Sequence, residues 1–94
     1  MTDMRALLSG LEAYHGSLGR HVVGLQGEFD DVSRAWAALD ECFSGNAADE
    51  FRPIWEGASG RFRDYTERTT HILRILADRI DQLRDAERTT GLSG

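Results

Sequence analysis

Apolar residues recur along the first half of the chain at alternating spacings of three and four residues. This alternation keeps side chains on one face of a helix, because one helical turn takes 3.6 residues. The spacing therefore predicts a helix over about residues 4–43. Five glycines in the same segment each cost roughly 1 kcal/mol of helix stability, which favours a helix that needs a packed partner. The apolar stripe consists of Leu11, Tyr14, Leu18, Val22, Leu25, Phe29, Val32, Trp36, Leu39 and Phe43.

The second half repeats the pattern and predicts a helix over about residues 47–87. Asn46 is expected to cap its first turn, with Asp49 as a capping-box partner. Pro53 removes one backbone hydrogen bond, so we expect a kink there or a helix whose regular part starts only near Pro53. Residues 89–94 are expected to fray. The apolar stripe consists of Ala48, Phe51, Trp55, Ala58, Phe62, Tyr65, Thr69, Ile72, Leu76, Arg79 and Leu83.

A short turn over residues 44–46 separates the two helices. Ser44 and Gly45 are typical of such a turn, and Gly45 can adopt the left-handed backbone that ends many helices. Two helices of similar length joined by a turn predict an all-α fold, an antiparallel two-helix hairpin in a single domain spanning residues 1–94. The seam of this hairpin is expected at Trp36, Leu39, Phe51, Trp55 and Phe62.

Away from the turn, the apolar stripes are wider than one hairpin seam can cover. A small hairpin has little core of its own, and the single cysteine, Cys42, cannot form an intramolecular disulfide. The surplus predicts a four-helix-bundle dimer, either with a second copy or with another hairpin of the same kind. The predicted dimer interface consists of Leu11, Leu18, Val22, Leu25, Phe29, Ile72, Leu73, Leu76, Ile80 and Leu83.

Charge and composition narrow the range of partners. The net charge of −5 argues against nucleic acid, whose recognition requires a basic surface. No apolar run approaches the roughly 20 residues that a membrane span requires, and the N-terminus lacks the pattern of a cleaved signal peptide. Arg and acidic residues alternate along the second helix, which is typical of a solvated face carrying i, i+3 and i, i+4 ion pairs.

Residues with chemical potential are few. Glu12 and His15 have the Glu-x-x-His spacing of di-iron helical bundles, but the second helix offers no matching motif. His21 and His71 have no serine or cysteine arranged beside them for nucleophilic catalysis. Acidic neighbours disfavour a reactive thiolate at Cys42. We therefore predict no catalytic residue, no metal, no cofactor and no enzymatic activity.

The centre of the chain resembles the WXG family, the early-secreted-antigen-like (ESAT-like) small proteins of bacterial type VII secretion. That family has a Trp-x-Gly turn between two helices, followed by small residues and then aromatic residues at helical spacing. This chain is similar in having Phe43-x-Gly45 at its centre, Ala47 and Ala48 after the turn, then Phe51 and Trp55. Phe43 replaces the family's tryptophan.

The resemblance implies a non-enzymatic secreted substrate or secretion partner that acts through dimerisation. Such a protein is cytoplasmic before export and leaves by the type VII route without a cleaved signal peptide; its partners would be a WXG-like protein, the secretion machinery or a toxin cargo. The family's export signal, Tyr-x-x-x-Asp/Glu, is absent, because Thr69 follows Tyr65 at that spacing and Leu18 follows Tyr14. A partner would then supply the signal. The alternative is a cytosolic adaptor or targeting chaperone, not itself exported, for a larger toxin with a similar N-terminal hairpin.

Overall fold

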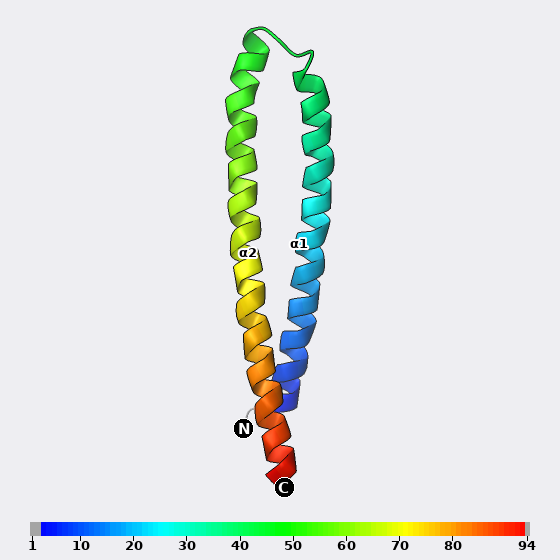
Figure 1. The fold of residues 1–94 in the computed structure, drawn as a ribbon, viewed down its shortest axis with the longest axis vertical. Helices are drawn as coiled ribbons and strands as arrows, with labels where there is room; N and C mark the ends of the chain where they lie inside the picture. The colour runs from blue at the N-terminus through cyan, green and yellow to red at the C-terminus, as the bar shows by residue number, and fades with distance from the viewer. Residues whose placement is uncertain (1–2, 94) are drawn as a thin grey trace.

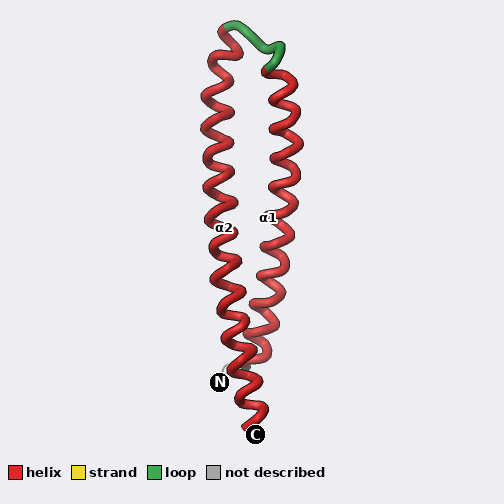
Figure 2. The backbone as a smooth tube through the Cα atoms, viewed as in Figure 1, coloured by secondary structure: helices red, strands yellow, loops and turns green. Residues whose placement is uncertain are grey.

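The computed structural model describes residues 3–93 and consists of two long antiparallel helices. Helix α1 spans Met4–Asp40 and helix α2 spans Asn46–Ser93. They lie side by side and are joined by one loop at one end of the rod, so the start of α1 and the end of α2 both lie toward the other end (Figure 1). The rod measures 73 × 18 × 17 Å, and the described residues form no strand (Figure 2). The predicted all-α hairpin is therefore confirmed for a single chain.

Helix α1 begins with a side-chain cap and ends earlier than the sequence suggested. The Asp3 carboxylate accepts hydrogen bonds from the backbone amides of Arg5 and Ala6, which otherwise lack partners inside the helix. The last helical residue is Asp40, whereas the apolar spacing extended the helix to residue 43. Phe43 lies instead in the connection between the helices, where its ring centroid is 6.3 Å from that of Trp36 and 6.5 Å from that of Phe51.

Helix α2 is longer than predicted at both ends. Gly45 has a φ of +94°, as expected for a turn glycine, and its carbonyl accepts the first helical hydrogen bond from the amide of Asp49 at 3.1 Å. The helix thus begins at Asn46 and continues through Pro53, which excludes one of the two alternatives expected there, a helix whose regular part starts only near Pro53. Gly45, not Asn46, occupies the capping position. The backbone remains helical to Ser93, beyond the predicted end at residue 87.

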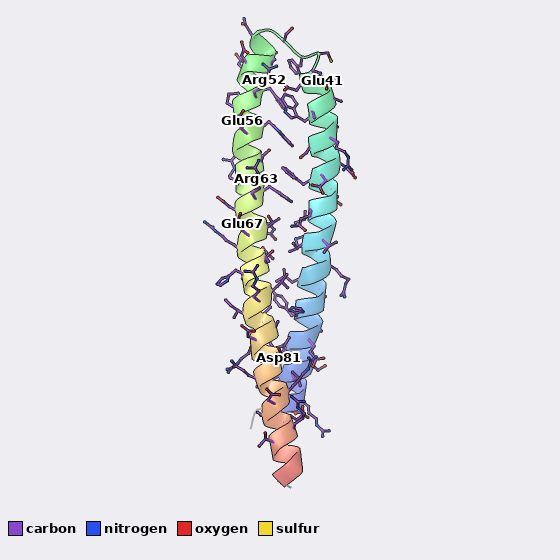
Figure 3. All side chains as sticks on the ribbon, in the orientation of Figure 1. Glu41, Arg52, Glu56, Arg63, Glu67 and Asp81 are labelled. Carbon is purple, nitrogen blue, oxygen red and sulfur yellow. The ribbon has the colours of Figure 1, made fainter. Side chains whose placement is uncertain are left out.

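Aromatic rings fill the half of the seam nearest the loop. Phe29 stacks on Phe62 with ring centroids 4.1 Å apart, and Trp55 lies 5.6 Å from Phe29. Trp36 follows, 4.8 Å from Phe51 and 6.2 Å from Trp55. Side chains occupy the space between the helices along the rod (Figure 3). These contacts place each residue of α1 beside a fixed level of α2.

The seam of α2 differs from the predicted stripe at alternate positions. The column of Ala48, Trp55, Phe62, Thr69, Leu76 and Leu83 faces α1 as expected, but it alternates with a different partner column. Ala58, Tyr65, Ile72 and Arg79 are exposed, and the residues that follow each of them, Ser59, Thr66, Leu73 and Ile80, are buried or half-buried instead. The seam is a regular heptad repeat, with a at Arg52, Ser59, Thr66, Leu73, Ile80 and Glu87.

Polar residues in this seam satisfy their hydrogen bonds unequally. The Thr66 hydroxyl donates to the Arg63 carbonyl at 2.9 Å, and the Thr69 hydroxyl donates to the Tyr65 carbonyl at 2.8 Å. Both bonds return to the helix that carries the threonine. The Ser59 hydroxyl is buried and has no hydrogen-bond partner among the described residues. The middle of the α2 seam therefore carries three hydroxyl side chains, of which two are hydrogen-bonded to their own helix.

Candidate partner-binding surface

Two cross-helix contacts identify the two flanks that border the seam. On α1 the a positions are Leu8, His15, Val22, Phe29 and Trp36. His21 comes directly before Val22, and Tyr65 comes directly before Thr66. Both residues therefore occupy g positions of the heptad repeat. The Tyr65 hydroxyl lies 3.3 Å from the His21 Nε2 atom, and the two rings meet edge to face. The g positions of the two helices therefore border the same flank, as antiparallel packing requires.

The flank marked by His21 and Tyr65, which we call the open flank, consists of the g and c positions of both helices together with the exposed d positions of α1, which are Met4, Val32 and Leu39. Ten of the eleven large apolar side chains that are exposed among residues 3–89 lie on it. The exception is Val23, which is 69% exposed on the opposite side of α1. The ten residues on the open flank are Met4, Leu7, Tyr14, Val32, Leu39, Phe51, Ile54, Tyr65, Ile72 and Ile75.

The opposite flank, which we call the charged flank, is bordered by the e positions. Glu12 and Arg84 form an ion pair there at 3.5 Å. Arg5 and Glu87 pair across the two helices at 3.0 Å nearer the chain ends. Two pairs of opposite charges on this flank are thus matched within the chain, whereas apolar groups on the open flank remain in water.

The exposed surface of the chain is large for its mass. Its accessible area is 7135 Å², whereas a compact protein of 10.5 kDa exposes about 5,400 Å². Only Leu8, Val22, Ala48 and Ile80 are buried apolar residues among those described. A standard protein interface removes about 800 Å² from each partner, so covering one flank would remove about half of this excess.

The structure assigns some predicted interface residues to the seam within one chain. Val22 and Ile80 are 4% and 5% exposed, and Phe29 stacks on Phe62, so these three have little surface left for a partner. The apolar spacing alone could not distinguish these seam residues from residues on a flank, because both kinds of position are apolar along the chain. Ile72, in contrast, is exposed on the open flank. The remaining residues of the predicted interface are half-buried: Leu11, Leu18, Leu25, Leu73, Leu76 and Leu83.

The residues predicted for the seam near the loop also fall into two groups, one in the seam and one on the open flank. Trp36, Trp55 and Phe62 are half-buried between the helices, as predicted. Leu39 and Phe51 are more than 40% exposed and lie on the open flank. Their register explains the difference, because Asp40 and Arg52 occupy the adjoining positions that face across the seam.

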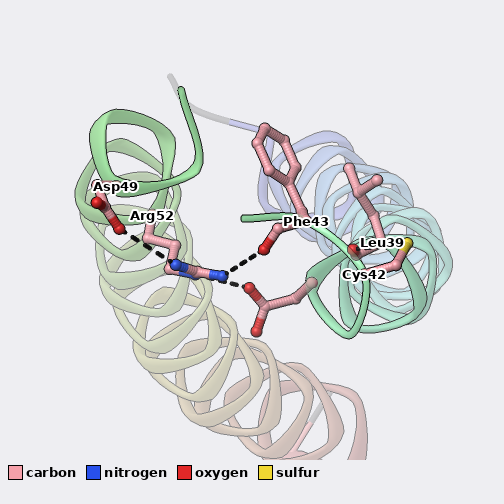
Figure 4. Close-up of polar contacts among 6 residues, drawn as sticks. Leu39, Cys42, Phe43, Asp49 and Arg52 are labelled. Carbon is pink, nitrogen blue, oxygen red and sulfur yellow. Dashed lines mark hydrogen bonds and ion pairs between the residues drawn. The ribbon is translucent and has the colours of Figure 1, made fainter. Parts of the chain in front are cut away.

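Arg52 fixes the loop and is a residue that sequence reasoning missed. Its guanidinium donates to the Asp40 carboxylate at 2.7 Å and to the Phe43 carbonyl at 2.8 Å, and it lies 3.5 Å from Asp49 (Figure 4). The hydrogen bond to Asp40 is the main cause that raises the pKa of Arg52 above its ordinary value. Arg52 therefore stays charged at neutral pH and holds the end of α1, the connection and the start of α2 together.

The turn motif of Phe43, Ser44 and Gly45 lies at the loop end of the rod. Phe43 is half-buried against the aromatic cluster, whereas Ser44 and Gly45 are exposed. Cys42 is exposed beside them, and its thiol donates to the Leu39 carbonyl at 3.4 Å. The loop end is therefore ordered by Arg52 and by ring packing, with its turn accessible.

Glu12 and His15, which have the Glu-x-x-His spacing, lie close to Asp81 and Arg84 of α2. Glu12 and His15 line a shallow recess with Asp81, but the Arg84 guanidinium lies between the two carboxylates, 3.5 Å from Glu12 and 3.7 Å from Asp81. No group of three or more metal-ligating side chains comes together in the part of the chain that the structure describes. Arg84 thus neutralises the acids that a metal would need.

Searches of protein-family models, curated proteins and solved structures find no match to this chain. Among the described residues, neither helix has a segment long and apolar enough to cross a membrane.

Proposed function

We propose that this chain acts by binding a second helical hairpin through its open flank, as a non-enzymatic, WXG-like small protein of a bacterial type VII secretion system. The supporting observation is the one-sided placement of exposed apolar residues, which a solvated rod has no reason to maintain. Covering that flank with two more helices produces a four-helix bundle. The protein would be a secreted substrate or the partner of one.

The family part of the proposal depends on the central motif and its setting. Phe43-x-Gly45 forms the turn between two helices, and Gly45 has the positive φ that makes glycine useful there. Phe51 and Trp55 follow at helical spacing and join the aromatic cluster. Such an arrangement is compatible with the resemblance, although any stable helical hairpin needs a turn and a packed seam.

Two valines on α1 provide a matched test of the binding surface. Val32 and Val23 are both more than half exposed, but Val32 lies on the open flank and Val23 on the other side. Val32→Asp should convert a particle of twice the chain mass into a monomer, because it would bury an unpaired charge. Val23→Asp should leave the mass unchanged. Light scattering decides between them, and the reverse pattern would place the partner on the opposite side.

The secretion role has its own test. The tagged chain is expressed with its genomic neighbours in a host that has a working type VII system and in the same host with that system disrupted. A secreted substrate or secretion partner appears in the medium of the first host only. Retention inside both hosts, together with co-purification of a larger protein with a similar hairpin, would support the adaptor alternative. Retention without such a protein would contradict both.

A further inference from the structure

Glycine is distributed unevenly between the two helices. All five glycines of α1 lie between residues 10 and 27, whereas α2 has none between Arg61 and Arg88. Relative to alanine, each glycine shifts the equilibrium between helix and open chain about fivefold toward the open chain. The first two-thirds of α1 therefore has a much weaker tendency to be helical than the part of α2 that lies beside it. The five are Gly10, Gly16, Gly19, Gly24 and Gly27.

Packing within the hairpin does not require these glycines. A Cβ atom added at four of the five meets no other atom within 4 Å, and one added at Gly16 meets only the flexible end of Arg20, at 3.3 Å. Among the described residues, Gly45 in the turn is the glycine that has a positive φ. Neither a close approach nor an unusual backbone conformation thus explains glycine in α1, and its effect there is to lower helix stability.

Ion pairs within each helix increase this contrast. In α2, Arg84 pairs with Asp81, and two further pairs form at the same i, i+3 spacing, which supports an isolated helix. In the described part of α1 the one such pair is Arg34 with Asp31, and it lies beyond the last glycine. The glycine-rich part of α1 therefore depends on contact with α2 to stay helical.

Contact between the helices is strongest in the loop half of the rod. Phe29 stacks there on Phe62 with ring centroids 4.1 Å apart, and Arg52 donates to the Asp40 carboxylate at 2.7 Å. Every phenylalanine and tryptophan of the chain belongs to this aromatic cluster. The Phe29–Phe62 stack marks the edge of the cluster, and the glycine-rich part of α1 begins directly beyond it.

The seam beyond that stack is partly polar. The His21–Tyr65 contact places Thr66 at this level, and the Thr66 hydroxyl is buried and bonded to its own helix at 2.9 Å. Leu8 and Val22 are the buried residues of α1. Nearer the chain ends, two ion pairs between largely exposed groups join the helices, and such pairs contribute little to stability.

We propose that residues 4–27 of α1, which we call the N-terminal arm, detach from α2 and unfold as a unit while α2 and the loop half of the hairpin stay folded. Such partial opening has a lower free energy than global unfolding. It is a conformational switch within the hairpin, because a ligand of the α2 seam can bind only after the arm opens. Opening requires no partner, so the inference is independent of the proposed function. The seam column that becomes accessible consists of Leu73, Leu76, Ile80 and Leu83.

Two alanines of α1 provide a matched test. Ala13 lies in the N-terminal arm and Ala37 in the loop half, and both are exposed. Replacing either by glycine should favour opening of its own part of α1 about fivefold. Amide hydrogen exchange of the full chain under native conditions measures the open population at each residue. We expect Ala13→Gly to speed exchange at Val22 about fivefold and Ala37→Gly to leave it unchanged.

The same experiment can overturn the inference. If Ala13→Gly and Ala37→Gly speed exchange at Val22 equally, the hairpin opens only as one unit and the arm does not exist as a separate part. Gly24→Ala adds a Cβ atom that meets nothing within 4 Å, so it should slow exchange at Val22 about fivefold. An unchanged rate in this variant would overturn the role of the glycines.

An arginine-specific protease provides a second test that does not depend on substitutions. Arg20 in the arm and Arg68 in α2 are both exposed, and the His21–Tyr65 contact places them at nearly the same level of the rod. Cleavage requires local unfolding around the site. In brief digestion of the folded full chain, we expect cleavage after Arg20 at least tenfold faster than after Arg68. Equal rates, or faster cleavage after Arg68, would overturn the proposed arm.

Discussion

The two flanks of the hairpin border the same seam but differ in what they leave exposed. On the charged flank, Arg84 pairs with Glu12 and Arg5 with Glu87, so two ion pairs join the helices there. On the open flank, residues such as Tyr14 and Ile72 remain in water, and the border charges Glu28 and Arg61 lack ion-pair partners within the described chain. A helix pair can close only one seam. The difference is the observation that supports the proposed binding of a partner on the open flank.

The His21–Tyr65 contact shows how narrow the division between seam and flank is. Tyr65 is 44% exposed, whereas its neighbour Thr66 is 8% exposed. One residue along a helix turns the side chain by about 100°, which is enough to move it from the seam to the flank. Substitutions at adjacent heptad positions should therefore have different consequences, and the predictions below use that contrast.

The largest effect is expected from charge in the seam. Phe29→Asp should cost about 4 kcal/mol or more, because it removes the ring stacked on Phe62 and buries a carboxylate. Helical circular dichroism should be lost at every protein concentration. Ile72→Asp, on the open flank, should leave the isolated hairpin helical and affect only its association. Equal loss of helicity in both variants would show that seam and flank are not separate surfaces.

A smaller effect is expected at the turn that brings the two helices into register. Gly45→Val should cost about 1–2 kcal/mol, because a β-branched residue is strained at a φ of +94°. This corresponds to a fall in Tm of about 5–10 °C. A Cβ at Gly45 meets no atom within 4 Å, so the cost comes from the backbone alone. Gly27→Ala, at an equally open helical site, should instead raise the Tm.

The polar middle of the seam should respond to removal of a single hydroxyl. Ser59→Ala is expected to raise the free energy of unfolding by about 1 kcal/mol, because its buried hydroxyl has no partner among the described residues. Thr66→Val should have the opposite sign, since the Thr66 hydroxyl donates to a backbone carbonyl. Denaturant unfolding measures both values. A destabilised Ser59→Ala variant would indicate a hydrogen bond formed with a partner chain.

The smallest effect is expected on the charged flank. A double-mutant cycle with Glu12→Gln and Arg84→Gln should give a coupling energy below about 0.5 kcal/mol that declines with added salt, because both groups are exposed. A coupling energy well above this value would contradict the expectation that exposed pairs on the charged flank contribute little to stability.

Sequence reasoning located the helices, the turn and half of the seam. The 3–4 spacing placed Trp36, Trp55 and Phe62 in the seam, and all three are half-buried between the helices. It chose Tyr65 and Ile72 for the alternate column, since both are more apolar than Thr66 and Ser59. Arg52 gave no signal, because one arginine among eleven basic residues looks like any other surface charge.

The amino-acid sequence by itself determined that this chain forms two amphipathic helices with a glycine turn at its centre, since periodicity and turn chemistry are local properties. It also determined that there is more apolar surface than two helices can hide. Only the tertiary structure decided which columns meet, because that depends on how Phe29, Trp36 and Trp55 interlock and on how Arg52 fixes the loop. Once those contacts set the rotation of each helix, Ser59 and Thr66 entered the seam and Tyr65 and Ile72 were left on the open flank.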